Sequence, residues 1–241
     1  MPDITITKVP FRTGHRYKVE GDDRVDPSQA LPTISTIAKH ADAGSSDGLL
    51  YWAVDAYIET GIRNAFEQKR DSAAATGTDL HADIEEYIAT GEQPKSPSAL
   101  FGSWYSSLHE AGIDWYASEI MVYGPNGFGG TVDAIGYLDG VPTLFDWKTT
   151  DELDKRGKRK RINNPTHATQ IGGYLWAIDM MAEQFPELPQ PVQAYLIYVF
   201  KDTLQVLWKP IDVKKSMEAF QAAHMLYTLT HGKGGGLYVQ S

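Results

Sequence analysis

The sequence contains no cysteine among its 241 residues. Disulfide bonds, cysteine-ligated zinc and iron–sulfur clusters are therefore excluded, and the composition fits a cytoplasmic protein without requiring one. Long hydrophobic runs are also lacking, since the longest apolar stretch, around Tyr195–Phe200, is much too short to span a bilayer. The first residues do not have the layout of a signal peptide. We therefore expect a cytoplasmic protein that makes no contact with membranes.

Positive charge is scarce, because 22 lysine and arginine residues stand against 31 acids and give a net charge of −9. Taken alone, this balance argues against a protein that coats nucleic acid. The positive charges are not spread evenly along the chain, because six of them lie within seven positions: Lys155, Arg156, Lys158, Arg159, Lys160 and Arg161. This basic segment on an acidic body predicts local contact with a polyanion. The alternative is a solvated loop that touches nothing.

The first half of the chain is predicted to be mainly helical. Hydrophobic residues make up 42% of the sequence, which is typical of a folded globular protein. The first thirty residues alternate weakly and predict a short hairpin. Apolar residues then recur at helical spacing from Thr33 to Phe66, and further helices are expected over Thr78–Ala89 and Ser98–Ala111. We predict that residues 1–241 form a single domain. Its first part, to about residue 112, contains the hairpin and these helices, and its second part, over about 113–230, contains a sheet and further helices.

After residue 112 the apolar period changes to two. Three consecutive strands are predicted over Tyr116–Tyr123, Gly129–Leu138 and Val141–Lys148. A helix over 165–184, strands over 192–200 and 204–209, and a final helix over 213–229 follow. Helices first, and then a mostly antiparallel sheet with a crossover helix, predict an α/β or α+β domain with a central mixed sheet flanked by helices.

Two aspartates are predicted to meet across the second hairpin of this sheet. If the Asp-Gly loop at 139–140 has two residues, counting outward from it places Asp133 opposite Asp146. Two carboxylates held this close require a proton on one of them or a cation between them. Lys148 lies two residues beyond Asp146 and therefore shares its face. The cluster indicates a functional site, and the alternative is a surface salt-bridge cluster.

The neighbouring strand carries a third acid, Glu119. This residue faces Asp133 if the loop at 125–127 has three residues, and a loop of another length shifts it. The spacing therefore leaves two alternatives for Glu119, at the site or beside it.

The order of these residues resembles the core motif of the PD-(D/E)XK nuclease superfamily, which is an Asp, a gap of about a dozen residues and then Asp-x-Lys. In this chain the motif is Gly130–Asp133 followed by Asp146–Lys148. Upstream, Gly77–His81 reads Gly-Thr-Asp-Leu-His and is similar to the Gly-Thr-x-x-His motif of RecB-type nucleases. Downstream, Gln170–Tyr174 matches the Q-x-x-x-Y helix motif of the same branch.

The resemblance covers about residues 31 to 178, and its motifs occur in the order of the family. The early segments Leu31–Ile37 and Leu50–Ala53 are similar to the N-terminal region of phage-encoded and mitochondrial genome-maintenance exonucleases. The fold implied is a PD-(D/E)XK, restriction-endonuclease-like core with an N-terminal helical region. Relatives often clamp this fold with a four-cysteine iron–sulfur cluster, which this chain cannot form.

The resemblance also implies the roles of the site residues. Asp133 and Asp146 would bind Mg²⁺ or Mn²⁺, with the backbone carbonyl of Trp147 as a further candidate ligand. His81 would supply an imidazole, which shifts the preference toward Mn²⁺. Lys148 would orient or activate the attacking water, or stabilise charge on the phosphate. Considered without the motif, His81 is also compatible with a hydrogen-bonded core histidine.

A second set of residues has a supporting role in the family. Glu119 corresponds to an acidic position near the site, and Gln170 and Tyr174 imply contacts to the active-site lysine or to DNA. The alternative is a core tyrosine with a glutamine at its edge. Gly172 and Gly173 are unfavourable inside a helix, so we expect another part of the chain to approach their backbone closely.

The sequence thus predicts a metal-dependent DNA exonuclease that hydrolyses phosphodiester bonds. It resembles phage-encoded enzymes, in which case it would act in the cytoplasm of the host cell during DNA recombination, repair or replication. Expected partners are DNA, as single strands or duplex ends, and recombination or replication proteins. The alternatives are an endonuclease or flap nuclease on the same fold, and a nucleic-acid-binding module without catalysis.

Overall fold

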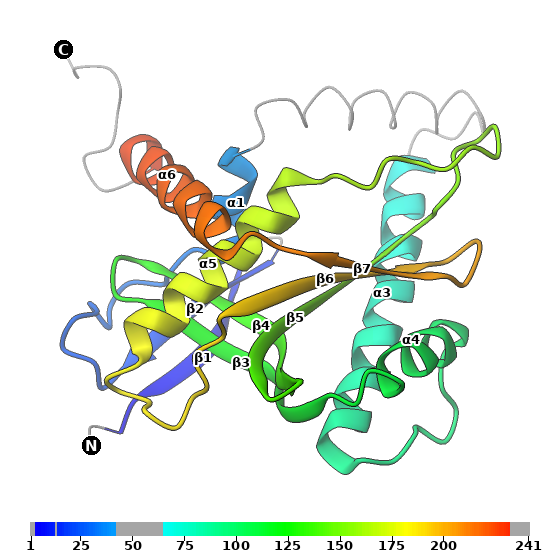
Figure 1. The fold of residues 1–241 in the computed structure, drawn as a ribbon. Helices are drawn as coiled ribbons and strands as arrows, with labels where there is room; N and C mark the ends of the chain where they lie inside the picture. Colours follow the sequence, from blue (N-terminus) through cyan, green and yellow to red (C-terminus); the bar gives the residue numbers. More distant parts are fainter. Residues whose placement is uncertain (1–2, 13, 42–64, 232–241) are drawn as a thin grey trace.

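The computed structural model describes residues 3–12, 14–41 and 65–231, with side chains in the first long helix from residue 77 onward (Figure 1). Most of the helical pattern predicted from Thr33 to Phe66, with its segment Leu50–Ala53, lies outside the described residues. The predicted N-terminal hairpin is present as β1 (Thr5–Phe11) and β2 (Gly14–Glu20).

The strands of the larger sheet are β3 (Asp114–Gly124), β4 (Phe128–Leu138), β5 (Val141–Thr150), β6 (Gln193–Phe200) and β7 (Val206–Pro210). The helices are α1 (Ile34–Ala38), the short 3-10 helix η1 (Lys39–Ala41), α3 (Ala65–Thr90), α4 (Ala99–His109), α5 (Pro165–Met181) and α6 (Val213–His231). Among the described residues, none of these helices is both long enough and apolar enough to cross a bilayer.

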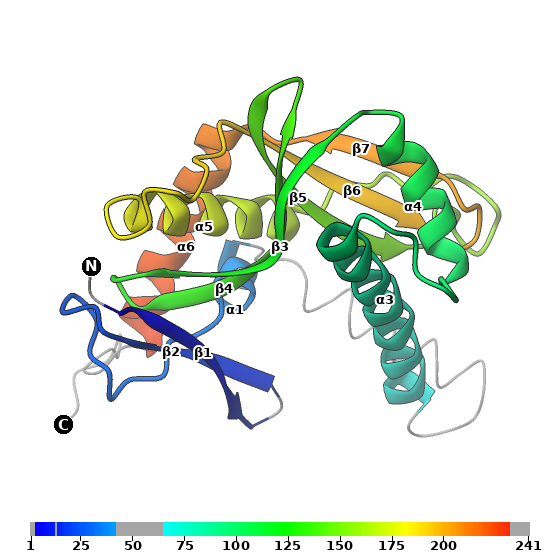
Figure 2. The ribbon, with the colours of Figure 1, turned by 90° about the horizontal axis from the view of Figure 1, so that it is seen from below.

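The five strands form one mixed sheet in the order β3-β4-β5-β6-β7. All neighbours are antiparallel except β5 and β6, which run parallel and are connected through α5. Helices α1, α5 and α6 cover one face, and α3 and α4 cover the other (Figures 1 and 2). The predicted arrangement of a central mixed sheet between helices is therefore confirmed.

The Asp-Gly hairpin loop has the two residues on which the sequence count relied, and the loop at 125–127 has three residues. β4 and β5 pair from Leu138 and Val141 to Ala134 and Phe145, around a two-residue Asp-Gly loop whose φ angles are both positive. β3 and β4 turn through three residues between Gly124 and Phe128. The register of β4 and β5 follows the sequence count as far as Ala134 and Phe145, whereas the predicted pair of Asp133 with Asp146 lies one step beyond the end of the ladder.

The predicted start of the second helix at Thr78 is wrong, because α3 already begins at Ala65. Gly77 lies inside this helix, and a Cβ atom there would come within 3.2 Å of Thr149 Oγ1. The glycine therefore permits close contact between α3 and β5 instead of marking a helix start. Helix α4 begins as predicted, with Ser98 Oγ accepting a hydrogen bond from Phe101 N at 3.3 Å.

The Gly-Gly pair of α5 lies where other elements approach its backbone. A Cβ atom on Gly172 would come within 1.9 Å of Ser216 O in α6. A Cβ on Gly173 would come within 2.6 Å of Ile34 Cγ2 in α1. The two glycines thus allow α5 to pack tightly against both neighbours, as the sequence predicted.

Candidate metal centre

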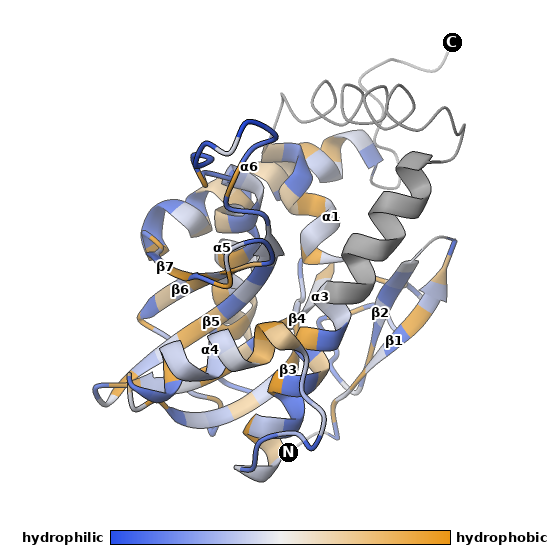
Figure 3. Cartoon of the chain, turned by 90° about the vertical axis from the view of Figure 1, so that its right-hand side faces the viewer, coloured by the Kyte–Doolittle hydropathy of each residue, from blue (hydrophilic) through white to orange (hydrophobic). Residues whose placement is uncertain are grey.

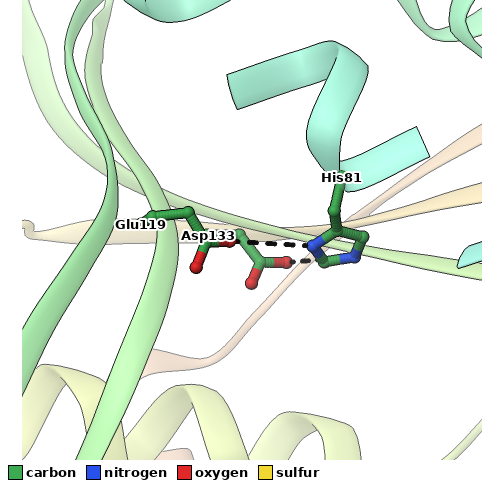
Figure 4. Close-up of side chains that lie close together, drawn as sticks. All are labelled: His81, Glu119 and Asp133. Atoms are coloured by element: carbon green, nitrogen blue, oxygen red, sulfur yellow. Dashed lines mark ion pairs between the residues drawn. The ribbon is translucent and has the colours of Figure 1, made fainter. Parts of the chain in front are cut away.

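Three side chains from α3, β3 and β4 converge beside the sheet (Figure 4). His81, Glu119 and Asp133 each present a ligand atom within 4.8 Å of the other two. His81 Nδ1 lies 3.9 Å from Glu119 Oε1, and His81 Nε2 lies 3.9 Å from Asp133 Oδ2. These separations are too long for hydrogen bonds. Ligands about 2.1 Å from an octahedral Mg²⁺ lie about 3–4 Å apart, so the spacing is compatible with a divalent cation.

Glu119 reaches this cluster through an unusual backbone conformation. Its neighbours in β3 pair with Ala134 and Val132, so Glu119 stands opposite Asp133, as expected for the three-residue loop. The ladder omits Glu119 itself, whose φ is +51°. A positive φ is strained for a residue with a side chain, and such strain concentrates at functional sites.

Asp133 is held at the point where β4 and β5 part. Its Oδ2 accepts a hydrogen bond from Trp147 N at 3.0 Å. Asp133 lies one residue beyond Ala134, the last β4 residue of the ladder, so its carboxylate takes the place of a backbone acceptor for this N–H. Burial, and next the negative charge of Asp146, raise the pKa of Asp133 to about 7. The ionised form is therefore disfavoured without a cation nearby.

Asp146 is 1% exposed and is paired with Lys148. Lys148 Nζ lies 2.5 Å from Asp146 Oδ2, yet neither carboxylate oxygen accepts a hydrogen bond of standard geometry within the described part of the chain. Burial alone lowers the pKa of Lys148, but the charges of Asp146 and Asp133 outweigh it and raise the pKa above its usual value. Lys148 is thus the counter-ion of the buried carboxylate.

The donor set satisfies the chemical requirements of Mg²⁺ or Mn²⁺. His81, Glu119 and Asp133 offer one imidazole nitrogen and two carboxylates, and Asp146 adds a buried carboxylate with hydrogen-bonding capacity to spare. The structure therefore brings together His81 and Asp133, as predicted, and adds Glu119 to the cluster. Trp147 contributes its backbone N–H to Asp133, while a role for its carbonyl stays a prediction.

The charges around the imidazole favour its protonated form. Burial lowers the pKa of His81, but Glu119 and Asp133 outweigh this effect and raise it. His81, followed by Lys8, lowers the pKa of Glu119 against the opposing effect of burial. The alternative of an ordinary core histidine does not hold, because His81 is partly exposed and faces two carboxylates.

A polar network behind Lys148 was not found from the sequence. Asn164 Oδ1 accepts the N–H of Thr166, so its amide nitrogen faces His167 Nε2 at 3.1 Å. Nε2 must then accept, and Nδ1 carries the proton toward Tyr198 Oη at 3.0 Å. Burial, with a smaller effect of Lys148, lowers the pKa of His167 to about 4 and keeps it neutral.

Tyr198 links this network to the site. β5 and β6 pair in parallel register with Lys148 beside Tyr198, and the charge of Asp146 adds to burial in raising the pKa of Tyr198 to about 12. This contact cannot be read from the sequence, because it depends on which strands are neighbours in the sheet.

Gln170 and Tyr174 contact each other on α5. Gln170 Nε2 donates a hydrogen bond to Tyr174 Oη at 2.5 Å, and Tyr174 is 4% exposed. Burial, and then the charges of Asp146 and Asp133, raise the pKa of Tyr174. The pair thus has the arrangement of a core tyrosine with a glutamine at its edge, and the tyrosine lies within electrostatic reach of both acids. Contact of either residue with DNA stays a prediction.

The basic segment forms an exposed turn in the loop that follows β5. Figure 3 shows hydrophilic residues gathered in such connecting loops. Two of its cations stabilise the loop itself, since Arg159 Nε lies 3.0 Å from Glu152 Oε1 and Lys160 Nζ donates to Asp151 O at 3.1 Å. The backbone N–H groups of Arg156 and Lys158 donate to the Asp154 carboxylate. The turn leaves the side chains of Arg156, Lys158 and Arg161 exposed.

No known family profile matches the chain, and no curated protein matches it. Among solved structures, one titled "Crystal structure of SSO0001" is similar over 73% of this chain and 70% of that one, with 17% sequence identity and a TM-score of 0.34. A similarity this low carries no conclusion about function.

Proposed function

We propose that the protein is a metal-dependent DNA exonuclease with a RecB-type PD-(D/E)XK core. The observation that carries the proposal is the convergence of His81, Glu119 and Asp133 beside the buried Asp146–Lys148 pair. Four of these five residues occupy the motif positions of the resemblance, and they come from three separate elements of the chain. A stability role alone does not account for two buried carboxylates in one cluster, because desolvating them is unfavourable.

The candidate ligands for Mg²⁺ or Mn²⁺ are His81, Glu119, Asp133 and Asp146. When bound, such an ion polarises a phosphate oxygen and lowers the pKa of water at the site. Beside the metal ion, Lys148 supplies a positive charge that belongs to the protein. Its ammonium, held at the edge of the cluster by Asp146, is suited to donate hydrogen bonds to a phosphate oxygen and to stabilise charge that develops there during hydrolysis.

Three alternatives differ in how DNA is used. The resemblance to genome-maintenance exonucleases favours attack from strand ends, whereas an endonuclease or flap nuclease would use the same residues on internal bonds. A binding module would need no intact site, so the retention of His81, Asp133, Asp146 and Lys148 favours catalysis. In the proposed setting the enzyme acts on DNA in the cytoplasm, of the host if phage-encoded, with recombination or replication proteins as partners.

The test is release of acid-soluble nucleotides from labelled DNA with Mn²⁺. We expect release that stops with EDTA and in Asp146→Asn, and that persists in the control Asp139→Asn, which makes the same change at the exposed β4–β5 turn. Oligonucleotides blocked at both ends should resist. Their cleavage would favour the endonuclease, and DNA binding without any cleavage would favour the binding module.

A further inference from the structure

The N-terminal hairpin is basic, in contrast to the acidic chain. Between Thr5 and Glu20 it carries four lysine or arginine residues and one acid, and the cations are Lys8, Arg12, Arg16 and Lys18. The predicted nuclease motifs begin after this hairpin, so the function proposed above assigns it no part. The basic hairpin is therefore a candidate anion-binding element that the nuclease motifs do not include.

The two faces of the hairpin have different surroundings. Tyr17 and Val19 are buried at 2% and 1% exposure, so their face packs against the body of the protein. Lys8 is the register partner of Tyr17 and therefore shares this inner face. Lys18, between Tyr17 and Val19 in the strand, points to the opposite, outer face.

The hairpin lies beside the β3–β4 hairpin (Figure 2), and its strand β2 contacts β4. Tyr17 Oη lies 2.8 Å from Thr131 Oγ1 of β4, and Tyr17 N and O bond to the backbone of Leu31. A Cβ atom on Gly129 would come within 2.8 Å of the Tyr17 side chain, so this glycine admits the tyrosine. The position of Lys8 is thus set by contacts of its neighbouring strand with β4.

Lys8 meets the candidate metal centre at Glu119. Its Nζ lies 3.7 Å from Glu119 Oε2, and the side chain of Lys8 stays 44% exposed. An exposed ion pair of this kind adds little to stability. Lys8 and a divalent cation also compete for the same carboxylate, so occupation of the metal centre leaves this ammonium beside the site and open to an anion.

We propose that Lys8 is a substrate-binding residue whose ammonium contacts a backbone phosphate of the nucleic-acid strand at the site, which makes the N-terminal hairpin one wall of the substrate groove. The proposal rests on the nuclease function proposed above and extends it to an element outside the family-like motifs. A phosphate contact of this kind holds the strand without reading its bases.

The chain offers a matched pair of variants for the test. Lys8→Met and Lys18→Met remove the same charge from the same hairpin, on its inner and outer face. The probe is a fluorescein-labelled single-stranded oligonucleotide with Ca²⁺, titrated by anisotropy at several salt concentrations in an Asp146→Asn background. We expect Lys8→Met to bind about tenfold more weakly and to lower the slope of log K against log salt by about 0.7. Lys18→Met should keep the parental slope, and Lys8→Arg should restore it.

A second readout does not involve nucleic acid. Because Lys8 competes for Glu119, Lys8→Met should bind Mn²⁺ more tightly by calorimetry, by up to about fivefold, while Lys18→Met should not change. Unchanged Mn²⁺ affinity in Lys8→Met would overturn the placement of Lys8 at Glu119. Equal salt slopes in the two variants would overturn only the role of Lys8, whereas a parental protein that binds Mn²⁺ but no oligonucleotide would overturn the proposed function as well.

Discussion

Glu119 and Asp133 stand opposite each other on β3 and β4, although the φ of +51° at Glu119 takes this residue out of the ladder. The carboxylates of Glu119 and of the buried Asp133 both lie 3.9 Å from the imidazole of His81. Glu119 has Lys8 and His81 as counter-charges, whereas Asp133 is buried beside the negative charge of Asp146, which makes its ionised form unfavourable without a metal.

Asp133→Asn is expected to stabilise the metal-free protein at neutral pH. The folded pKa of Asp133, about 7, lies above its ordinary value of 3.8. The stability that this residue contributes is present below the lower value and is lost as the pH rises through the upper one. The variant removes this loss, while its amide oxygen still accepts from Trp147 N.

Thermal unfolding in EDTA tests this expectation. The variant and the parent should differ little near pH 4, and the variant should become more stable by on the order of 2 kcal/mol toward pH 8. The exposed substitution Asp139→Asn serves as control and should follow the parent. A difference that shrinks with rising pH would contradict the assignment of Asp133 as a destabilised carboxylate.

Lys148→Met should weaken the metal-free protein, because it leaves Asp146 buried without its counter-ion. Breaking a buried ion pair costs about 3–5 kcal/mol, and saturating Mn²⁺ should recover part of this loss by replacing the missing positive charge. Denaturant titration with and without Mn²⁺ measures this effect on stability.

Turnover of Lys148→Met should fall by about 10²–10⁴-fold, as for other positioned catalytic groups. Loss of Mn²⁺ binding, or near-normal turnover, would argue against the role of Lys148.

Arg156, Lys158 and Arg161 are exposed in the basic segment, and under the proposed function we expect them to contact DNA. Replacing all three with Ser should lower the slope of log K against log salt by about 2–3, since each neutralised phosphate contributes about 0.7–0.9. The weakening should be similar for different sequences. Mn²⁺ affinity should not change.

Salt titration of the triple variant by anisotropy checks this expectation. Lys95, Lys214 and Lys215, replaced together by Ser, provide a control with the same loss of charge at other exposed positions. If the two triple variants give the same slope, the basic segment is a solvated loop and DNA passes elsewhere.

Gly172→Ala is expected to destabilise the protein strongly, because its Cβ would collide with the backbone of α6 at Ser216. Overpacking of this kind costs about 1–3 kcal/mol or more. Gly102→Ala is the matched control in α4, where a Cβ meets nothing within 4 Å. That substitution should stabilise by up to about 1 kcal/mol through helix propensity. Chemical denaturation of both variants gives the comparison, and similar effects would contradict the tight contact of α5 with α6.

The sequence by itself determined those parts of the protein that depend on local spacing. The loop at 139–140 set the register that brings Asp133 to the end of the β4–β5 ladder near Asp146. For Glu119 the sequence left two alternatives, and the three-residue loop found in the structure selects the position opposite Asp133. In both hairpins the side-chain period of two converts loop length directly into which residues share a face, so no long-range information is needed.

Only the tertiary structure decided the contacts between segments far apart in the chain. Lys8 reaches Glu119 because Tyr17 anchors the hairpin on β4. Tyr198 stands beside Lys148 because β6 pairs in parallel with β5 after a crossover through α5. Such neighbours follow from which apolar faces pack together, and local periodicity reveals that a face is buried but not what covers it.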